Sequence, residues 1–345
     1  MNIVYALSGE GRGHGSLARA VLPVLQRAGH RLKIVTYGQS LGQLEDYDVL
    51  PIRGIKHYYD RHSRLSLLRS IAKNAGVLSY YVSNWKTIRR QLKDFSPDLF
   101  IVNFEPFTPL IARSLKVPVL SFDNQHALLC LKQRVPEGLR MSAWTTKTAI
   151  RLVAPRAEHY VVITFFPIEN DRSNVHVVPP VVNDEIRQLS PGNGSKVLVY
   201  LKHPNARFLK ILRQMDGQFL IYGYDTAITD GNLTYRVFNS QMPAELGDCK
   251  AVMGTAGLSL ISEAVWLKKP FFGIPLKNEF EQTMSAMAVK QMGFGDFSED
   301  PTKEQIQQFL GNLDGYRRSL GEYRFDPDAA ARKLLELIAA TPGRD

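Results

Sequence analysis

A glycine-rich turn that contains one histidine lies near the start of the sequence. Residues 8–15 read Ser-Gly-Glu-Gly-Arg-Gly-His-Gly, between an apolar stretch at 2–7 and a helical pattern that begins at Ser16. Glycines let the backbone of such a turn approach a ligand at the amino-terminal end of the helix. The turn holds His14 at the carboxyl end of a strand, where open α/β sheets bind their ligands. A histidine that only caps the turn fits the same pattern.

The spacing of this turn argues against two nucleotide-binding motifs. A phosphate-binding P-loop requires a lysine, and residues 8–15 contain none. The dinucleotide fingerprint requires a third glycine at the position of His14, and an acidic residue at the end of the next strand, which ends at Thr36 without one. The sequence therefore does not favour a nicotinamide-dependent oxidoreductase.

A second glycine-bearing turn precedes a helical pattern in the last third of the sequence, and it consists of Gly254, Thr255, Ala256 and Gly257. The backbone amides and the positive dipole at the start of that helix can hold a diphosphate. Glu263 falls near the second helical turn, from which its carboxylate can bridge two vicinal hydroxyl groups. Glu281 and Gln282 begin a later helix, where a carboxylate and an amide can hydrogen-bond sugar hydroxyls.

Short β-branched stretches alternate with helical patterns along most of the chain, which is typical of βαβ units and a parallel sheet. Strand patterns in the first half lie at 2–7, 31–36, 99–103, 117–122 and 160–165, with a first helix at 16–28. The second half has strand patterns near 196–201, 219–223, 233–238, 251–254 and 270–274, and helices near 204–215, 258–267 and 280–292. The predicted fold class is α/β, with two Rossmann-like doubly wound domains.

The length of 345 residues exceeds that of one ordinary domain, and the sequence marks a boundary. Residues 175–181 read as a strand that runs into proline- and glycine-rich sequence up to Gly194, where domain boundaries tend to fall. We predict an N-terminal domain at 1–182, a C-terminal domain at 183–325, and a C-terminal helix at 326–345 that packs back on the N-terminal domain.

The pairing of the two turns resembles nucleotide-sugar glycosyltransferases of the GT-B fold. The Gly-x-Gly-x-Gly-His turn combines with a block over residues 250–295 that reads Gly-x-Ala-Gly-x-Ser, then Glu-Ala, a proline and Glu-Gln. The sequence is most similar to the group that includes the lipid II-forming N-acetylglucosaminyltransferase and the UDP-glucuronosyltransferases. This resemblance implies two domains that face each other across a cleft, with the acceptor in the first and a UDP-sugar in the second.

The resemblance also implies roles for the donor-binding residues. The turn at 254–257 contacts the phosphates, Glu263 the ribose, and the backbone near Phe238 the base. Lys202, which follows the first strand of the second domain, adds positive charge near the diphosphate unless it belongs to a solvated turn. The sugar meets two side chains, Glu281 and Gln282.

Inverting transfer is a displacement at the anomeric carbon, so it requires a base for the acceptor hydroxyl and positive potential for the departing diphosphate. His14 matches the position of the family's histidine and is the first candidate base. Glu105 follows the strand at 99–103 and is the second, although a residue just before Pro106 can equally be a capping or solvated acid. His126, after the next strand, is the third, and only geometry can choose among them.

The sequence predicts no metal ion and no cofactor besides the UDP-sugar. Helix amino termini and basic groups can stabilise a departing diphosphate without a cation. The string Asp46-Tyr47-Asp48 lies outside both glycine turns, and Asp326-Pro327-Asp328 is explained as a helix cap followed by proline at the first helical position.

The chain carries a net charge of +10, and most of that surplus lies in residues 53–93, which hold ten Lys and Arg residues and a single acid. Leucine, tyrosine and tryptophan are interleaved with these cations. Such a basic amphipathic segment can bind an anionic membrane or an acceptor on a phosphate-linked lipid, or its apolar residues can be ordinary core. The candidate residues on this acceptor or membrane side are Arg53, Lys56, Arg61, Arg64, Arg69 and Lys73.

The sequence favours a cytoplasmic protein that is peripheral on the inner face of the membrane. It has no secretory pattern at its start, no stretch long enough to span a bilayer, and only two cysteines. Nucleic acid is the less favoured partner, because no nucleic-acid-binding motif accompanies the basic segment.

The sequence therefore predicts an inverting, metal-independent hexosyltransferase that moves a sugar from a UDP-sugar to a glycan, lipid-linked or small-molecule acceptor. One alternative is a UDP-sugar 2-epimerase of the same fold, which needs no separate acceptor. The other is a nucleotide-sugar- or polyanion-binding protein without turnover.

Overall fold

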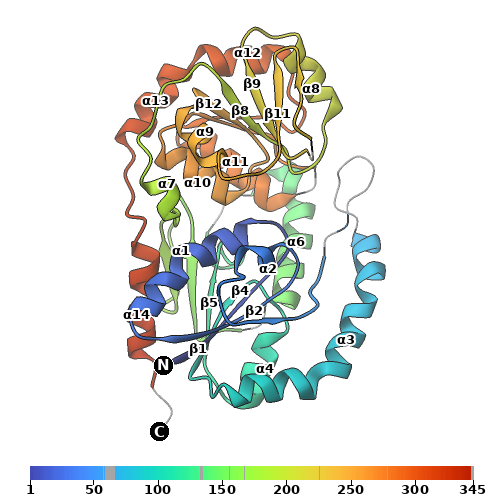
Figure 1. Ribbon diagram of the computed structural model, residues 1–345, viewed down its shortest axis with the longest axis vertical. Coiled ribbons are helices and arrows are strands. Elements are labelled where there is room, and N and C mark those ends of the chain that lie inside the picture. The colour runs from blue at the N-terminus through green and yellow to red at the C-terminus, as the bar shows by residue number, and fades with distance from the viewer. Residues whose placement is uncertain are drawn as a thin grey trace. The chain divides into compact units, whose positions relative to one another are not determined.

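The computed structural model describes residues 1–56, 58, 67–132, 135–154, 156–166, 168–224, 226–277 and 279–342. The chain divides into two compact units, one formed by Met1–Val181 together with Asp326–Asp345 and the other by Val182–Phe325. Each unit consists of a parallel-dominated sheet with helices packed on it, which confirms the predicted α/β fold class (Figure 1).

Among the described residues, the sheet of the first unit has the strand order β3-β2-β1-β4-β5-β6-β7. The strands are β1 (Asn2–Leu7), β2 (Arg31–Thr36), β3 (Val49–Pro51), β4 (Leu99–Asn103), β5 (Val119–Asp123), β6 (His159–Ile163) and β7 (Val175–Val178). All of these neighbours pair in parallel, and Leu7 of β1 lies beside Asn103 of β4. The strand order reverses between β1 and β4, so the carboxyl ends of both strands meet where doubly wound sheets bind ligands.

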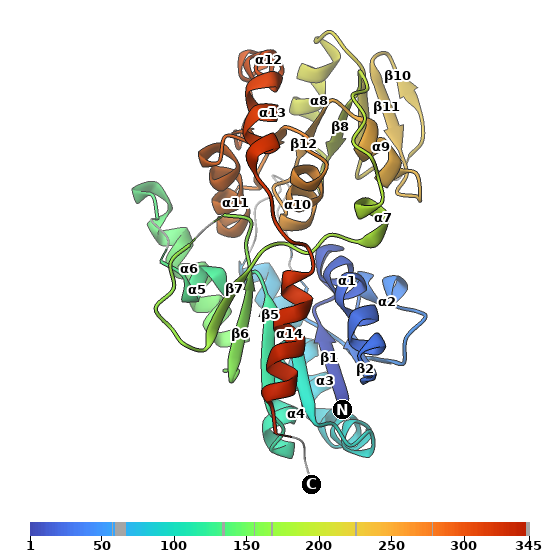
Figure 2. The same ribbon diagram turned by 90° about the vertical axis from the view of Figure 1, so that its left-hand side faces the viewer.

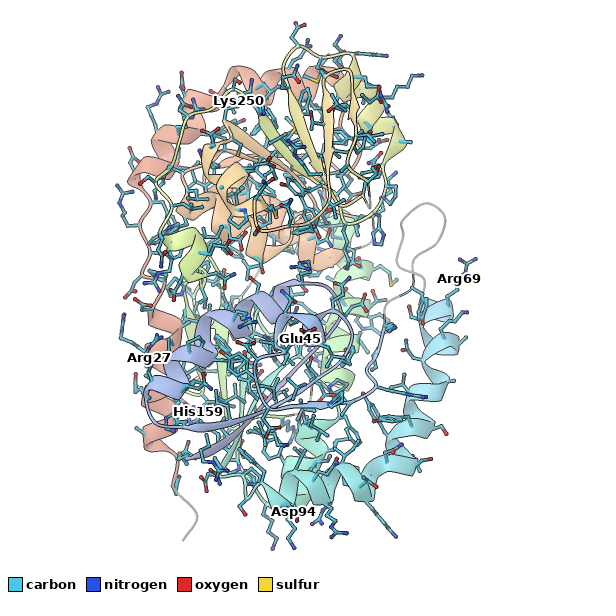
Figure 3. The ribbon with its side chains drawn as sticks, in the orientation of Figure 1. Arg27, Glu45, Arg69, Asp94, His159 and Lys250 are labelled. Carbon is cyan, nitrogen blue, oxygen red and sulfur yellow. The ribbon has the colours of Figure 1, made fainter. Side chains whose placement is uncertain are left out.

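The helices of the first unit are α1 (Gly13–Arg27), α2 (Gln39–Gln43), α3 (Leu67–Asp94), α4 (Thr108–Leu115), α5 (Ala127–Cys130), α6 (Arg140–Val153) and α14 (Ala329–Ala340), with a 3-10 turn at Glu137–Leu139. Helices α1 and α14 lie side by side on one face of the sheet, where α14 also contacts β6 and β7 (Figure 2). Helices α3 and α4 cover the other face, where Ile88 and Ile111 pack in one cluster with Val4. Figure 3 shows the length of α3, with Arg69 and Asp94 near its two ends.

The second unit repeats this plan with the strand order β10-β11-β9-β8-β12-β13-β14 among its described residues. The strands are β8 (Val197–Tyr200), β9 (Phe219–Tyr222), β10 (Thr229–Asp230), β11 (Leu233–Arg236), β12 (Ala251–Gly254), β13 (Phe271–Gly273) and β14 (Gly295–Phe297). Strand β10 is antiparallel to β11, and the other neighbours are parallel. Here the order reverses between β8 and β12.

The helices of the second unit are α7 (Asp184–Arg187), α8 (Ala206–Arg213), α9 (Met242–Asp248), α10 (Leu258–Trp266), α11 (Phe280–Gln291), α12 (Lys303–Gly311) and α13 (Leu313–Glu322). Phe208 of α8 and Phe309 of α12 share a core cluster with Val199 of β8, so these two helices cover one face of the sheet. Helices α10 and α11 pack against β13.

Candidate functional site

The N-terminal glycine turn places His14 at the carboxyl edge of the first sheet. Helix α1 begins at Gly13, before the predicted start, because helical hydrogen bonding already begins within the glycine turn. His14 therefore lies in the first helical turn, and its Nδ1 is 2.6 Å from Oδ1 of Asn103, the last residue of β4. A Cβ at Gly9 would lie 1.6 Å from the carbonyl oxygen of Tyr37, so the close approach of these two segments requires glycine.

Glu105 caps the amino-terminal end of α4. Its side chain is fully buried and accepts hydrogen bonds from the N–H of Phe107 at 2.9 Å and from the N–H and hydroxyl of Thr108 at 2.7 and 2.5 Å. Burial raises the pKa of Glu105, and the hydrogen bonds from Thr108 and Phe107 oppose that shift. These contacts match the capping alternative, so Glu105 has a structural role that accounts for its position.

Substitution of Glu105 separates capping from catalysis. Glu105→Gln keeps one of the two acceptor oxygens but turns an NH₂ group toward the other backbone donor, and is expected to cost about 1–2 kcal/mol of unfolding free energy. Glu105→Ala leaves two buried backbone N–H groups without their acceptor and is expected to cost about 3 kcal/mol. Urea denaturation at pH 7 measures both values. Equal losses would contradict the cap, and a large loss of turnover in a stable Glu105→Gln variant would restore Glu105 as a base.

His126 is buried in an ion pair with Asp123. Its Nδ1 lies 2.9 and 2.8 Å from the two carboxylate oxygens of Asp123 and 3.0 Å from Oγ of Ser121, which itself donates to Asp123. Burial opposes the charged forms, but the attraction between the two groups dominates: the pKa of His126 is raised and the pKa of Asp123 is lowered. His126 is only 4% exposed, so its imidazole is engaged in this buried ion pair.

A small cavity lies between these two candidate bases. Its lining includes Glu105, Ser121, Asp123 and His126 at the carboxyl ends of β4 and β5. The cavity volume of about 10 Å³ has room for one water molecule. It is too small for a sugar or a lipid headgroup, so the acceptor of a transfer reaction does not fit between Glu105 and His126.

The second glycine turn lies where the second sheet reverses its strand order. Thr255 donates its N–H to the carbonyl of Tyr200 at 3.0 Å, and its hydroxyl oxygen accepts from the N–H of Lys202 at 3.0 Å. A Cβ at Gly254 would lie 2.2 Å from the carbonyl oxygen of Tyr200, so the turn packs directly on the end of β8. Gly257 is the N-cap residue of α10 and has no side chain to cap its amides. The structure thus brings Lys202 and this turn together at the start of α10.

Glu263 lies on α10 and is half-buried. Burial, followed by the negative charge of Glu185 on α7, raises the pKa of Glu263 to about 7. Its carboxyl group therefore titrates near neutral pH. Ala256, in the turn before the helix, is buried.

Helix α11 carries the two residues assigned to the sugar. Glu281 is in its first turn, and Oε1 of Gln282 accepts the N–H of Leu276 at 3.0 Å. The amide oxygen of Gln282 thus fixes the loop after β13, while the NH₂ group of the same side chain is the part that can donate to a ligand.

Phe238 belongs to an aromatic cluster at the carboxyl ends of β8, β9 and β11. Its ring is nearly perpendicular to that of Tyr200, with centroids 5.4 Å apart, and lies 5.6 Å from that of Tyr222. The hydroxyl group of Tyr222 donates to Glu245 at 2.5 Å. The sequence motifs do not predict either tyrosine as a site residue. An aromatic residue at the end of a strand, next to the point where the strand order reverses, is the pattern that could have indicated them.

Helix α3 has a buried face and an exposed face. On the buried face Tyr81 stacks on Phe107, with ring centroids 4.0 Å apart and planes within 8°. On the exposed face Leu78 and Val82 are 69% and 74% accessible. The core interpretation of the basic segment therefore holds for one side of the helix, and the other side presents apolar side chains to the surroundings. Membrane binding stays a prediction.

The predicted cations of this segment are distributed before and along α3. The guanidinium group of Arg53 lies 5.2 Å from the ring centre of Tyr80, and the backbone of Lys56 exchanges two hydrogen bonds with the side chain of Asn74. Arg69 and Lys73 lie on the first turns of α3, and their side chains are exposed. Two candidates fall outside the described residues: Arg61 and Arg64.

The two acidic strings take part in other contacts. Asp46 pairs with Arg19 at 2.7 Å, and Asp48 pairs with Lys33 at 2.9 Å. The cap of the last helix differs from the prediction: α14 begins at Ala329, and Asp326 accepts the N–H of Asp328 at 2.9 Å in the turn before it. In the described part of the chain, no three His, Cys, Asp or Glu side chains gather as a metal site would require.

No helix in the described ranges is both long and apolar enough for a bilayer span. This includes α3, whose 28 residues contain several Lys and Arg side chains.

Comparison with known proteins identifies a family. A model of glycosyl transferase family 1 matches residues 1–314. A protein of Methanosarcina acetivorans described as an uncharacterized glycosyltransferase is 22% identical over 391 aligned positions, which cover 97% of the chain and 98% of that protein.

Solved glycosyltransferase structures share the fold over their full lengths. The calicheamicin glycosyltransferase CalG4 has a TM-score of 0.67 at 16% identity, covering 99% of the chain and 98% of CalG4. MurG of Acinetobacter baumannii has a TM-score of 0.59 at 18% identity, with 99% and 100% covered. VinC in complex with dTDP has a TM-score of 0.63 at 14% identity, with 99% of both chains covered. These neighbours confirm the predicted GT-B fold.

Proposed function

The chain belongs to glycosyl transferase family 1, and on that premise we propose that it transfers a hexosyl group from a UDP-sugar to an acceptor hydroxyl group, with inversion and without a metal ion. The observation that carries this proposal is the turn at Gly254, whose backbone leads into the uncapped amides of α10 at the reversal of the second sheet. Such amides stabilise the negative charge of a departing diphosphate.

The displacement assigns one task to each unit. As the acceptor oxygen forms its bond to the anomeric carbon, the bond from that carbon to the diphosphate oxygen breaks and UDP leaves with the electron pair. The acceptor proton passes to the imidazole of His14, at the carboxyl edge of β1. Glu263 holds the ribose hydroxyls, and the side chains of Glu281 and Gln282 hold the sugar. His14 is preferred over Glu105 and His126 because those two are engaged in a helix cap and a buried ion pair.

Donor binding is expected to depend on the charge of Glu263. Glu263→Gln should weaken binding of the UDP-sugar about tenfold or more, because a carboxylate accepts two hydroxyl hydrogen bonds where an amide accepts with one oxygen. Since the pKa of Glu263 is about 7, donor affinity should fall as the pH decreases below 7. Isothermal titration with UDP at several pH values measures both effects.

Glu185→Gln is the matched control for this titration. It removes the neighbouring negative charge that helps to raise the pKa of Glu263, so the loss of affinity should occur at a lower pH. An unchanged pH dependence in this variant, together with full affinity in Glu263→Gln, would remove Glu263 from the donor site.

The reaction itself is tested by product release. A thermal-shift screen with UDP- and dTDP-sugars comes first, because a ligand that binds the native state raises its melting temperature, and the related fold of VinC binds dTDP. We expect UDP-sugars to give the larger shift, and UDP to be released only when an acceptor is added. Interconversion of the sugar without an acceptor would instead show an epimerase, and binding without either reaction would show a protein that does not turn over.

We further propose that the exposed face of α3 binds an anionic membrane that carries the acceptor. Arg69 and Lys73 stand at the start of the helix, Lys86 follows the apolar pair, and each cation near an anionic surface contributes about 1 kcal/mol. Leu78 and Val82, which lie between these charges in the sequence of the helix, add exposed apolar area.

Vesicle sedimentation tests this surface. Vesicles with phosphatidylglycerol should bind the protein in a salt-dependent manner, and vesicles of phosphatidylcholine alone should not. The double substitution Leu78→Ser with Val82→Ser should weaken binding about tenfold or more, since it removes two apolar side chains from the interface. Leu110→Ser, at an exposed position of α4, is the control. Equal binding of both variants would exclude the α3 face.

A further inference from the structure

The turn between β4 and α4 holds a strained residue beside His14. Phe104 has φ of +53°, a backbone conformation that costs a residue with a side chain about 1 kcal/mol or more. Its ring is parallel to the imidazole of His14, with planes within 5° and centroids 6.4 Å apart. The preceding residue, Asn103, contacts His14, and the following residue, Glu105, is fixed by α4. The backbone strain at Phe104 is thus retained because its two neighbours, Asn103 and Glu105, are both fixed by hydrogen bonds.

Asn103 contacts His14 through its side-chain amide oxygen. Its side chain is fully buried, and Oδ1 lies 2.6 Å from Nδ1 of His14. An amide oxygen can only accept a hydrogen bond, so this contact requires a proton on Nδ1. A neutral imidazole with its proton on Nδ1 carries its lone pair on Nε2.

The other end of the Asn103 amide faces Tyr5. Burial raises the pKa of Tyr5, the Asn103 amide opposes that shift and the negative charge of Asp123 adds to it, so the phenol stays neutral. A neutral phenol oxygen accepts from an amide NH₂ group, which is compatible with an amide whose oxygen faces His14. Within the described residues, neither Nδ2 of Asn103 nor the Tyr5 hydroxyl has a well-formed hydrogen bond to another group.

We propose that Asn103 is a positioning residue, which fixes the Nδ1–H tautomer of His14 and thereby presents Nε2 to the acceptor hydroxyl. The inference rests on the proposed function, in which His14 accepts that proton. Because Asn103 is neutral, it orients the ring without adding a negative charge that would hold the transferred proton on the imidazolium. The proton can then leave to solvent, and the base is regenerated for the next turnover.

Two substitutions of Asn103 test this role through the pH profile. Asn103→Asp keeps an acceptor oxygen and adds a negative charge next to the imidazole, which raises the pKa of a histidine by about one to three units. The acidic limb of kcat/KM is therefore expected to move to higher pH by about one unit or more. Asn103→Leu removes the acceptor and should lower kcat about tenfold or more with little change in the donor KM. A merely structural residue would lower stability in both variants and leave the kcat of the folded Asn103→Leu variant close to that of the wild type.

Nitrogen NMR of the full chain measures the tautomer without substitution at Asn103. With ¹⁵N-labelled histidine, the signals of His14 are those that disappear in His14→Ala. We expect a protonated Nδ1 and an unprotonated Nε2 in the neutral ring, and a proton on Nε2 would overturn the inference even if the Asn103 variants do not fold.

The same experiments separate this inference from the proposed function. Full turnover of His14→Ala would remove the base and with it the function of Asn103. An inactive His14→Ala, combined with a wild-type kcat in the folded Asn103→Leu variant, would leave His14 as the base and overturn only the role of Asn103.

Discussion

Substitution of His14 by alanine is expected to lower kcat by a factor of about 10² to 10⁴, which is the usual contribution of a positioned general base. The donor KM should change little, because the residues that we propose to bind the donor lie in Val182–Phe325, the other compact unit. Release of UDP in the presence of a saturating acceptor measures both parameters. The expected pattern identifies an interaction that operates in the transition state and not in donor binding.

His30→Ala is the matched control, since His30 follows α1 and lies outside the glycine turn. This variant should retain kcat within about twofold. If His14→Ala keeps full activity, or if its loss appears only in the donor KM, the assignment of the base is wrong.

Removal of Asp123 is expected to cost about 3–5 kcal/mol of unfolding free energy, because it breaks a buried ion pair from one side. Asp123→Ala leaves the buried His126 without its counter-charge and takes an acceptor from Ser121. Urea denaturation at pH 6 measures the loss. Asp46→Ala removes an exposed ion pair with Arg19, and a cost of about 0.5 kcal/mol or less is expected there. Similar losses in the two variants would contradict the buried pair.

The pair also predicts the pH dependence of stability. The pKa of His126 is raised in the folded state. Its contribution to the free energy of unfolding is therefore complete below the unfolded pKa of 6.5 and is lost as the pH rises through the raised pKa. The pKa of Asp123 is lowered, so its contribution is complete above the unfolded value of 3.8 and is lost as the pH falls through the lowered pKa. The wild type should therefore lose stability above pH 6.5 relative to an Asp123→Asn/His126→Gln double variant.

The parts of the fold that could be predicted are those with a local signal. Buried parallel strands are short apolar stretches, so the predicted ranges at 99–103 and 251–254 coincide with β4 and β12. Helix α3 was predicted only as a basic amphipathic segment, because the partner of its buried face, Phe107 on the next βα turn, is distant in sequence. Helix α6 was not predicted, since its exposed residues Met141 and Trp144 disturb the apolar periodicity.

The candidate site was predictable to a similar extent. Both glycine turns were readable because glycine spacing is a local property, and the structure explains the close approaches at Gly9 and Gly254. The contact of His14 with Asn103 spans 89 positions, so no pattern in either segment predicts it. Glu105 was ambiguous from sequence because a capping acid and a catalytic acid have the same side chain, and only its burial distinguishes them.

The return of α14 to the first unit has a consequence for biosynthesis. The second unit lies in sequence between two parts of the first, and residues of α14 such as Leu334 and Ile338 are buried. During translation, β6 and β7 therefore cannot pack against α14 until the whole of Val182–Phe325 has been synthesised. The second unit can complete its core on the nascent chain, whereas the first can close only after synthesis of the last helix. The face of the sheet that α14 covers is thus the surface that a nascent chain leaves exposed for longest.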